Sequence, residues 1–208
     1  ENIDVADCMI DDIASVAVSI NKCFHVLLTD SKITNTYIGV ETYTDNVIDQ
    51  TYIRNTDIYA TFAGIQGAFA VSTIANVLVV SPVGINYTHI LNTNGVNILD
   101  HVTVDAKNAL VIADGVLKVT NNIFTDTTGN GEIGINYKYS GIVQEYNHND
   151  IYGFATPVWG CSVGTESIAI DPVFVGGSPF SYELNEASIL RINDEYGTEL
   201  GRYGNSRK

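Results

Sequence analysis

Three polar residues could place acid/base chemistry on one surface of the folded chain. Asp57, Asn76 and His101 are separated by 19 and 25 residues. If each follows one turn of a repeat, they lie on neighbouring strands about 5 Å apart. An aspartate beside a histidine can do general acid/base work. Any polar outer face shows similar columns, so we lean towards a noncatalytic protein and keep Asp57 and His101 as the catalytic candidates.

Aromatic residues near these positions favour a sugar-binding surface. Tyr59, Phe124 and Tyr152 each follow an aliphatic residue that we expect to point into the core. Because successive side chains of a strand alternate between its two faces, the three rings are expected on the outer face. Flat aromatic rings offer an apolar surface with a polar edge, which suits sugar rings. Tyr59, Phe124 and Tyr152 are therefore the carbohydrate-binding candidates.

An acidic, glycine-rich loop at residues 126–132 offers oxygen ligands. Asp126, Asn130 and Glu132 lie in the stretch Asp-Thr-Thr-Gly-Asn-Gly-Glu, and Ca²⁺ prefers carboxylate and carbonyl oxygens. The loop lacks the spacing of an EF-hand. It predicts either a calcium site or a plain surface loop, with the plain loop favoured. Apart from calcium, we expect no cofactor.

Composition excludes some classes of partner. The 208 residues carry a net charge of −14 with only 10 Lys and Arg, whereas a phosphate backbone requires clustered basic residues. No apolar run is long enough to span a membrane, so we expect neither nucleic acid binding nor membrane insertion. The three cysteines, Cys8, Cys23 and Cys161, form no Cys-x-x-Cys pair, which argues against zinc.

A repeat would position these residues. Gly-Ile-Asn-Tyr occurs at Gly84–Tyr87 and again at Gly134–Tyr137, 50 residues later. A series of aliphatic anchors recurs about every 24 residues, a period typical of solenoids. The anchors are Ile10, Ile33, Ile58, Val77, Val102, Ile123 and Ile151. Two series with one period indicate a structural repeat.

The repeated unit is expected to be a coil of short strands. The apolar pattern of a helix is missing, and β-branched residues, Tyr, Asn and Gly dominate. A propeller blade would need about 40 residues or more. The sequence predicts an all-β, right-handed parallel β-helix (β-solenoid) of about seven coils of about 24 residues. Residues 1–154 would form the coils, and residues 155–208 a closing coil and a loop-rich C-terminal cap.

Equivalent side chains of stacked coils should form columns. The anchors make one inward column, and the residues two positions earlier should make a small, polar inward column that hydrogen-bonds along the stack. These are Cys8, Ser31, Thr56, Ala75, Asp100, Asn121 and Asn149. Gly39, Gly64, Gly84 and Gly134 are expected to supply tight bends or positive φ.

Several segments resemble a known family. Val119–Phe124 and Tyr146–Gly153 look like the coil consensus of right-handed parallel β-helix proteins, the pectate-lyase-like superfamily in its broad sense. Asp171-Pro172-Val173-Phe174 and the stretch 199–204 are similar to the ending of bacterial surface β-helices. Arg191-Ile192-Asn193 departs from that ending. The resemblance implies the architecture, an extracellular or cell-surface location, and the C-terminal part or one module of a larger protein.

Function is less determined, because the superfamily includes lyases, hydrolases, adhesins and phage tail proteins. The main hypothesis is a noncatalytic module that binds carbohydrate, adheres, or supports structure. The alternative is a polysaccharide lyase or glycoside hydrolase, although Lys32 and Arg54 lack the surrounding Asp cluster that such lyases use. A third hypothesis is a filament subunit that self-associates through exposed coil edges.

Overall fold

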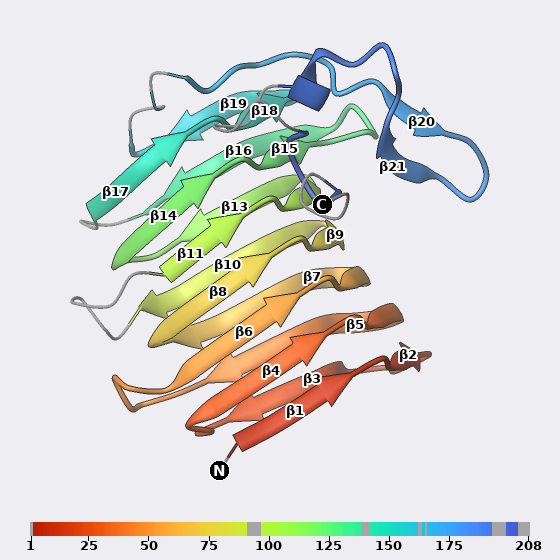
Figure 1. Ribbon diagram of the computed structural model, residues 1–208. Helices are drawn as coiled ribbons and strands as arrows, with labels where there is room; N and C mark the ends of the chain where they lie inside the picture. The colour runs from red at the N-terminus through yellow and green to blue at the C-terminus, as the bar shows by residue number, and fades with distance from the viewer. Residues whose placement is uncertain are drawn as a thin grey trace.

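Alternating apolar residues fold this chain into short parallel strands that stack along one axis (Figure 1). The computed structural model describes residues 2–90, 97–138, 142–161, 164, 166–192 and 199–203. The only helix among them is the 3₁₀ turn η1, Ile189–Ile192. None of the described helical segments is long and apolar enough to cross a membrane.

The first face of the stack is a seven-stranded parallel sheet. The chain completes about six turns between its first and last strands, close to the expected number of coils. Leu28, Ile53, Ile74 and Leu99 are fully buried and form one column of the core behind this face. The strands are β1 (Asn2–Ala6), β4 (His25–Thr29), β6 (Gln50–Arg54), β8 (Val71–Ala75), β11 (Asn97–Asp100), β14 (Val116–Thr120) and β17 (Ile142–Asn147).

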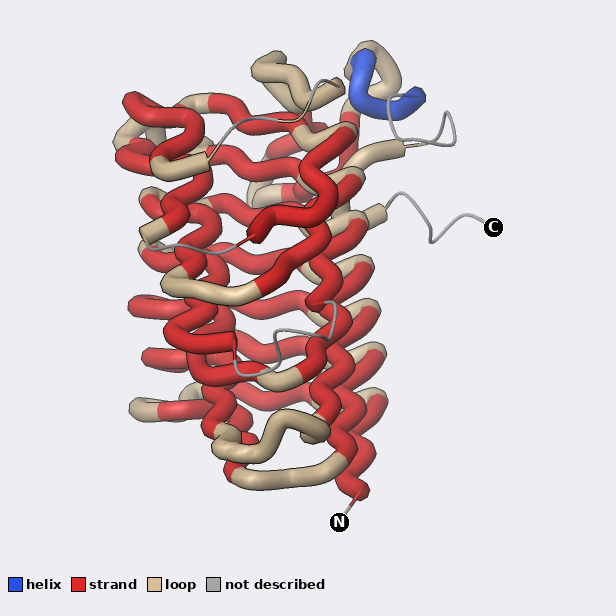
Figure 2. Tube along the Cα trace, turned by 90° about the vertical axis from the view of Figure 1, so that its left-hand side faces the viewer, coloured by secondary structure: helices blue, strands red, loops and turns tan. Residues whose placement is uncertain are grey.

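A twelve-stranded sheet wraps around the second and third faces. The long strands β5 (Lys32–Tyr43) and β7 (Asp57–Phe69) run through both. Their first parts join the second face, with β2 (Met9–Asp11), β9 (Leu78–Val80), β12 (Thr103–Asp105), β15 (Ile123–Thr125) and β18 (Asp150–Tyr152). Their last parts join the third face, with β3 (Val16–Asn21), β10 (Val83–Ile90), β13 (Asn108–Ile112), β16 (Gly131–Tyr137) and β19 (Phe154–Trp159). Figure 2 shows the strands as one column, with η1 at its upper end.

The repeated tetrapeptide marks the same place in two coils. Ile85 pairs with Leu110, and Leu110 pairs with Ile135. Gly-Ile-Asn-Tyr therefore occurs at equivalent positions two turns apart, as predicted. Ile85 and Ile135 are fully buried, and Tyr87 is buried with them in the core.

The register of the second face differs from the predicted anchors. Its inward column is Ile10, Ile33, Ile58, Val79, Val104, Phe124 and Ile151. Val77, Val102 and Ile123 were therefore wrongly assigned to this column, by two, two and one residues. Val77 and Val102 are still buried, because they occupy the preceding corner. Ile123 points outward, and another part of the chain covers it.

One non-glycine residue per turn adopts left-handed backbone between the first and second faces. Asp and Asn tolerate this conformation better than most residues because their short polar side chains hydrogen-bond locally. The column is Asp7, Asp30, Asn55, Asn76, His101, Asn121 and His148, with φ between 49° and 60°. The ladder of backbone hydrogen bonds continues through it, for example from Asn76 N to Asp100 O at 3.3 Å. These residues mark where each coil turns from its first-face strand to its second-face strand.

The predicted polar column exists, but some of its members differ. It contains Cys8, Ser31, Thr56, Val77, Val102, Asn122 and Asn149, two positions before the inward column. Asn122 Nδ2 donates to Asn149 Oδ1 at 2.9 Å, and Val102 N donates to Asn122 Oδ1 at 2.8 Å. Hydrogen bonding along the stack is therefore confirmed, whereas Ala75, Asp100 and Asn121 lie outside this column.

The glycines of the third face are needed for close packing and not for positive φ. Gly84 lies outside the left-handed region. A Cβ atom there would lie 2.3 Å from Val104 Cγ1 and 2.4 Å from the carbonyl oxygen of Ala109. Gly39, Gly64 and Gly134 are crowded in the same way by the second-face column, and none has a positive φ. Of the two roles predicted for these glycines, tight bends or positive φ, the second is therefore wrong at all four positions.

The described residues from 166 to 203 form a segment that we name the clasp. It starts on the last coil, where Ile168 N donates to Asn149 O at 2.8 Å and Ile151 N donates to Ile168 O at 3.0 Å. An antiparallel hairpin follows, β20 (Phe174–Gly176) with β21 (Ser181–Leu184). Leu184, Leu190 and Leu200 then pack on Ile123 outside the solenoid. The segment expected to close the C-terminal end thus also turns back along the second face (Figure 1).

Candidate functional site

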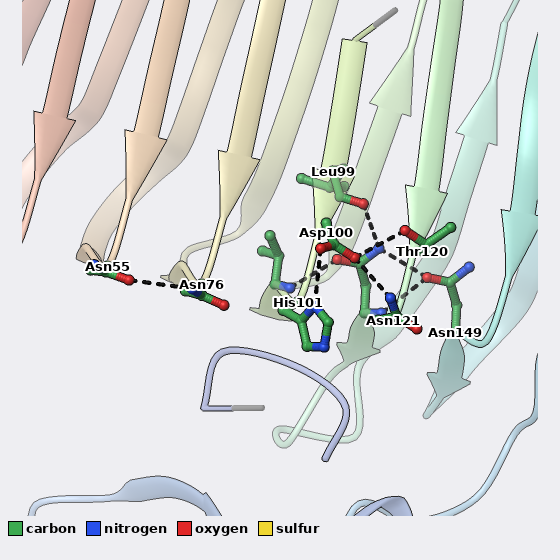
Figure 3. A network of polar contacts seen from close by, with 10 residues as sticks. Asn55, Asn76, Leu99, Asp100, His101, Thr120, Asn121 and Asn149 are labelled. Atoms are coloured by element: carbon green, nitrogen blue, oxygen red, sulfur yellow. Dashed lines mark hydrogen bonds and ion pairs between the residues drawn. The ribbon is translucent and has the colours of Figure 1, made fainter. Parts of the chain in front are cut away.

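Asp57 and His101 do not pair with each other, because each contacts a different side chain. Asp57 Oδ1 lies 3.0 Å from Nε of Arg202, a residue of the clasp. His101 is fully buried in the left-handed corner, and its Nδ1 lies 3.0 Å from Asp100 Oδ2 (Figure 3). Burial opposes ionisation of Asp100, but the hydrogen bond and charge of His101 hold the pKa of Asp100 below its usual value. Asp57 also belongs to a different column, in line with Leu78 and Thr103.

The three predicted aromatic residues are separated by the structure. Phe124 is fully buried in the core column, so its ring faces no solvent. Tyr59 is half-buried, and burial raises its pKa to about 12. Tyr152 remains 38% exposed, on the rim of a 530 Å³ groove that it shares with Phe180 of the clasp. A joint sugar platform of Tyr59, Phe124 and Tyr152 is not formed.

The predicted calcium loop is organised by its own hydrogen bonds. Asp126 Oδ1 accepts from Thr128 N at 2.8 Å, and Asp126 Oδ2 accepts from Asn130 N at 2.8 Å. Glu132 turns away to Lys107 Nζ, 2.7 Å from its Oε1. Among the described residues, no three His, Cys, Asp or Glu side chains gather to hold a metal. Calcium binding at this loop stays a prediction.

Carboxylates on the second face hold the clasp in place. Asp57 pairs with Arg202. Tyr182 Oη donates to the buried Asp105 Oδ2 at 2.6 Å, and Ile170 N donates to Asp150 Oδ1 at 2.8 Å. Burial and the hydrogen bond to Asp105 raise the pKa of Tyr182. The outward carboxylates of Asp57, Asp105 and Asp150 are therefore engaged by contacts with the clasp.

The third face carries an open groove over its early coils. We define the open groove by its lining, which comes from β5, the turn after β5, β7 and β10: residues 41–45, 66–68, 88 and 89. Its volume is 680 Å³. Glu41 and Gln66 pair in register on adjacent strands, and Gln66 Nε2 donates to Glu41 Oε1 at 2.9 Å. This places a carboxylate and an amide side by side on the floor of the groove.

Exposed aromatic rings lie on both sides of this polar pair. Tyr37 and Phe62 stack with ring centroids 4.9 Å apart and planes 7° from parallel. They remain 48% and 40% exposed. Tyr43, at the end of β5, is 55% exposed and lines the open groove. Tyr43 lies six positions after Tyr37 along β5, a span of roughly 20 Å in extended strand.

An Asp–His pair borders the open groove. His89 Nδ1 lies 2.7 Å from Asp114 Oδ2, and Asp114 Oδ1 accepts from Ile90 N at 2.9 Å. The second contact fixes the carboxylate, which in turn orients the imidazole of His89. His89 lines the groove and is about half exposed. It is the histidine whose setting suits proton transfer to a bound molecule.

The third-face residues were not singled out from the sequence. The alternation Tyr37, Glu41, Tyr43 around the crowded Gly39 was the available signal. It could have been found by extending the outward pattern from the Gly-Ile-Asn-Tyr repeat, where Asn86 pairs with Gln66.

Comparison of the chain with protein-family models, curated proteins and solved structures found no match. The parallel β-solenoid is shown by the structure itself. The finer resemblance to pectate-lyase-like proteins remains a prediction.

Proposed function

We propose that this protein is a noncatalytic β-solenoid module, outside the cell or on its surface, which binds glycan chains along its third face. The observation that carries the proposal is the open groove, together with the exposed Tyr37–Phe62 stack four residues before Glu41 and Gln66 on the same two strands. The rings offer apolar surface for sugar faces, and Glu41 and Gln66 offer hydrogen-bonding groups for hydroxyls. Stacked coils keep both on rigid strands, so little order has to be gained on binding.

The test is binding to a panel of immobilised polysaccharides, followed by titration of the best ligand. A Tyr37→Ala/Phe62→Ala double variant should weaken binding roughly tenfold, because it removes two stacking surfaces. Tyr152→Ala is the matched control, since Tyr152 is an exposed ring on the second face. If the double variant binds like the parent, or the control loses binding instead, the third face is not the binding surface.

A second candidate function is hydrolysis or lyase chemistry on the same glycan. The His89–Asp114 pair at the edge of the open groove favours it, because Asp114 orients an exposed imidazole. Release of reducing ends or unsaturated products, abolished in His89→Ala, would establish this alternative. Binding without turnover would support the noncatalytic module.

A further inference from the structure

The charges of the open groove bear on which glycans it can accept. Its lining contains two carboxylates, Glu41 and Asp45, and all of its lining residues are described. None of them is a lysine or arginine. Asp45 is paired with Lys22, so the like charge that an anionic ligand would meet in the groove is that of Glu41.

A lysine at the edge of the open groove, Lys22, is already paired with the lining residue Asp45. Lys22 Nζ lies 2.6 Å from Asp45 Oδ2 and 5.8 Å from the Tyr43 ring centroid. The hydrogen bond between the two side chains raises the pKa of Lys22 and lowers the pKa of Asp45. Both groups are therefore charged at neutral pH. The charge of Lys22 is therefore balanced within the protein. The imidazole of His89 is held by Asp114 at 2.7 Å.

The remaining hydrogen-bonding capacity of the floor is mainly that of an acceptor. Glu41 accepts from Gln66 Nε2 through Oε1, and the second carboxylate oxygen and the amide oxygen of Gln66 are further acceptors beside it. A carboxylate only accepts, so it pairs with sugar hydroxyls and repels another carboxylate. Like charges brought together at an interface discriminate strongly against the wrong partner.

We propose that the open groove selects uncharged polysaccharide and rejects polyanionic polysaccharide such as a polyuronate. This inference rests on the proposed function, since it names the chemical class of ligand for the same surface. Glu41 is the residue that determines the selection, because it lines the groove and lies between Tyr37 and Tyr43 along β5.

The experiment compares a neutral xylo-oligosaccharide with an oligogalacturonate of equal length by calorimetric titration of the whole chain. The neutral ligand should bind at least about tenfold more tightly at low salt, and the difference should shrink as salt screens the carboxylates. Glu41→Gln keeps the shape and the contact with Gln66, and should narrow the difference by improving binding of the oligogalacturonate.

Glu186→Gln is the matched control, because it removes the same charge from an exposed residue of the clasp. It should leave the preference unchanged. Equal or tighter binding of the oligogalacturonate by the parent protein would overturn the inference while leaving glycan binding in place. A chain that binds neither ligand, nor any glycan of the wider panel, would remove the proposed function and this inference together.

Discussion

The second and third faces belong to one sheet and share strands β5 and β7, but they use their outer side chains in opposite ways. On the second face, Asp57, Asp105 and Asp150 hold the clasp, and Ile123 packs under its leucines. On the third face, Glu41, Tyr43 and the Tyr37–Phe62 stack face solvent. Strand β7 carries residues of both kinds, since Asp57 pairs with the clasp and Phe62 belongs to the exposed stack. Whether an outer column is structural or available for a ligand therefore depends on distant parts of the chain.

The largest effect on stability is expected at Phe124 and Ile123, neighbouring residues whose side chains lie on opposite sides of the second-face sheet. Phe124→Ala empties the core and should lower the free energy of unfolding by about 3–5 kcal/mol. Ile123→Ala removes packing only under the clasp, so it should cost less and release mainly residues 166–203. Denaturant unfolding with hydrogen exchange distinguishes them. Equal loss of protection throughout the chain in both variants would show that the clasp is not a separate layer.

The attachment of the clasp should weaken as pH rises. Burial raises the pKa of Asp150 from 3.8 to about 7, against the opposing hydrogen bond from Ile170 N. Since the folded-state pKa is the higher one, the stability contribution is fully present below about pH 4 and is lost as pH rises through 7. The change in the free energy of unfolding is on the order of 4 kcal/mol.

Asp150→Asn is the control for this pH dependence. Asp171 lies close enough to raise the same pKa, and the His148–Glu166 pair joins the clasp to the last coil at 2.7 Å. Urea unfolding at mildly acidic and mildly alkaline pH should show a smaller difference in the variant. An unchanged difference would assign the pH dependence to one of these neighbouring groups.

A glycine of the third face tests how closely its coils pack. Gly84→Ala should destabilise the protein by about 1–3 kcal/mol, because the new methyl group meets Val104 and the Ala109 carbonyl. Gly129→Ala is a useful comparison, since its Cβ meets nothing but its φ is +75°. Thermal melts of the two variants separate crowding from backbone strain. A Gly84→Ala protein as stable as the parent would mean that neighbouring coils can move apart.

The smallest effect is expected at the hairpin of the clasp. Tyr182→Phe removes the hydrogen bond to the buried Asp105 and should cost about 1–2 kcal/mol. Thr127 N still donates to Asp105 Oδ1 at 2.9 Å, which limits the loss. Proteolysis within 174–184 should become faster, while glycan binding on the third face stays the same. A loss of glycan binding would show that the two faces are coupled.

The repeat itself was predictable, because a period of about 24 residues and alternating apolar positions leave few architectures. The register was harder to predict. Residues 77–80 read Val-Leu-Val-Val, so the apolar pattern fits two registers equally. The left-handed Asn76 and His101 resolve the choice, because each stands three residues before the inward Val79 and Val104.

The clasp and the open groove could not be found in the same way. The contact between Arg202 and Asp57 joins residues 145 positions apart and follows no period. Asp57 and Tyr59 lie on the outer face as expected, but no pattern in the sequence predicts which segment covers them. Phe124 was misplaced because Ile123 beside it is equally apolar and differs only in what packs against it.

The clasp has a consequence for the order in which the molecule forms. Solenoid coils make contacts with their nearest neighbours, so folding can spread from one coil to the next. The clasp contacts instead span 145, 99 and 77 residues, and long-range contacts form late. A slip of one residue in any strand would turn its carboxylate to the other side of the sheet. The clasp can therefore lock in place only after the coils carrying Asp57, Asp105 and Asp150 have stacked in the correct register.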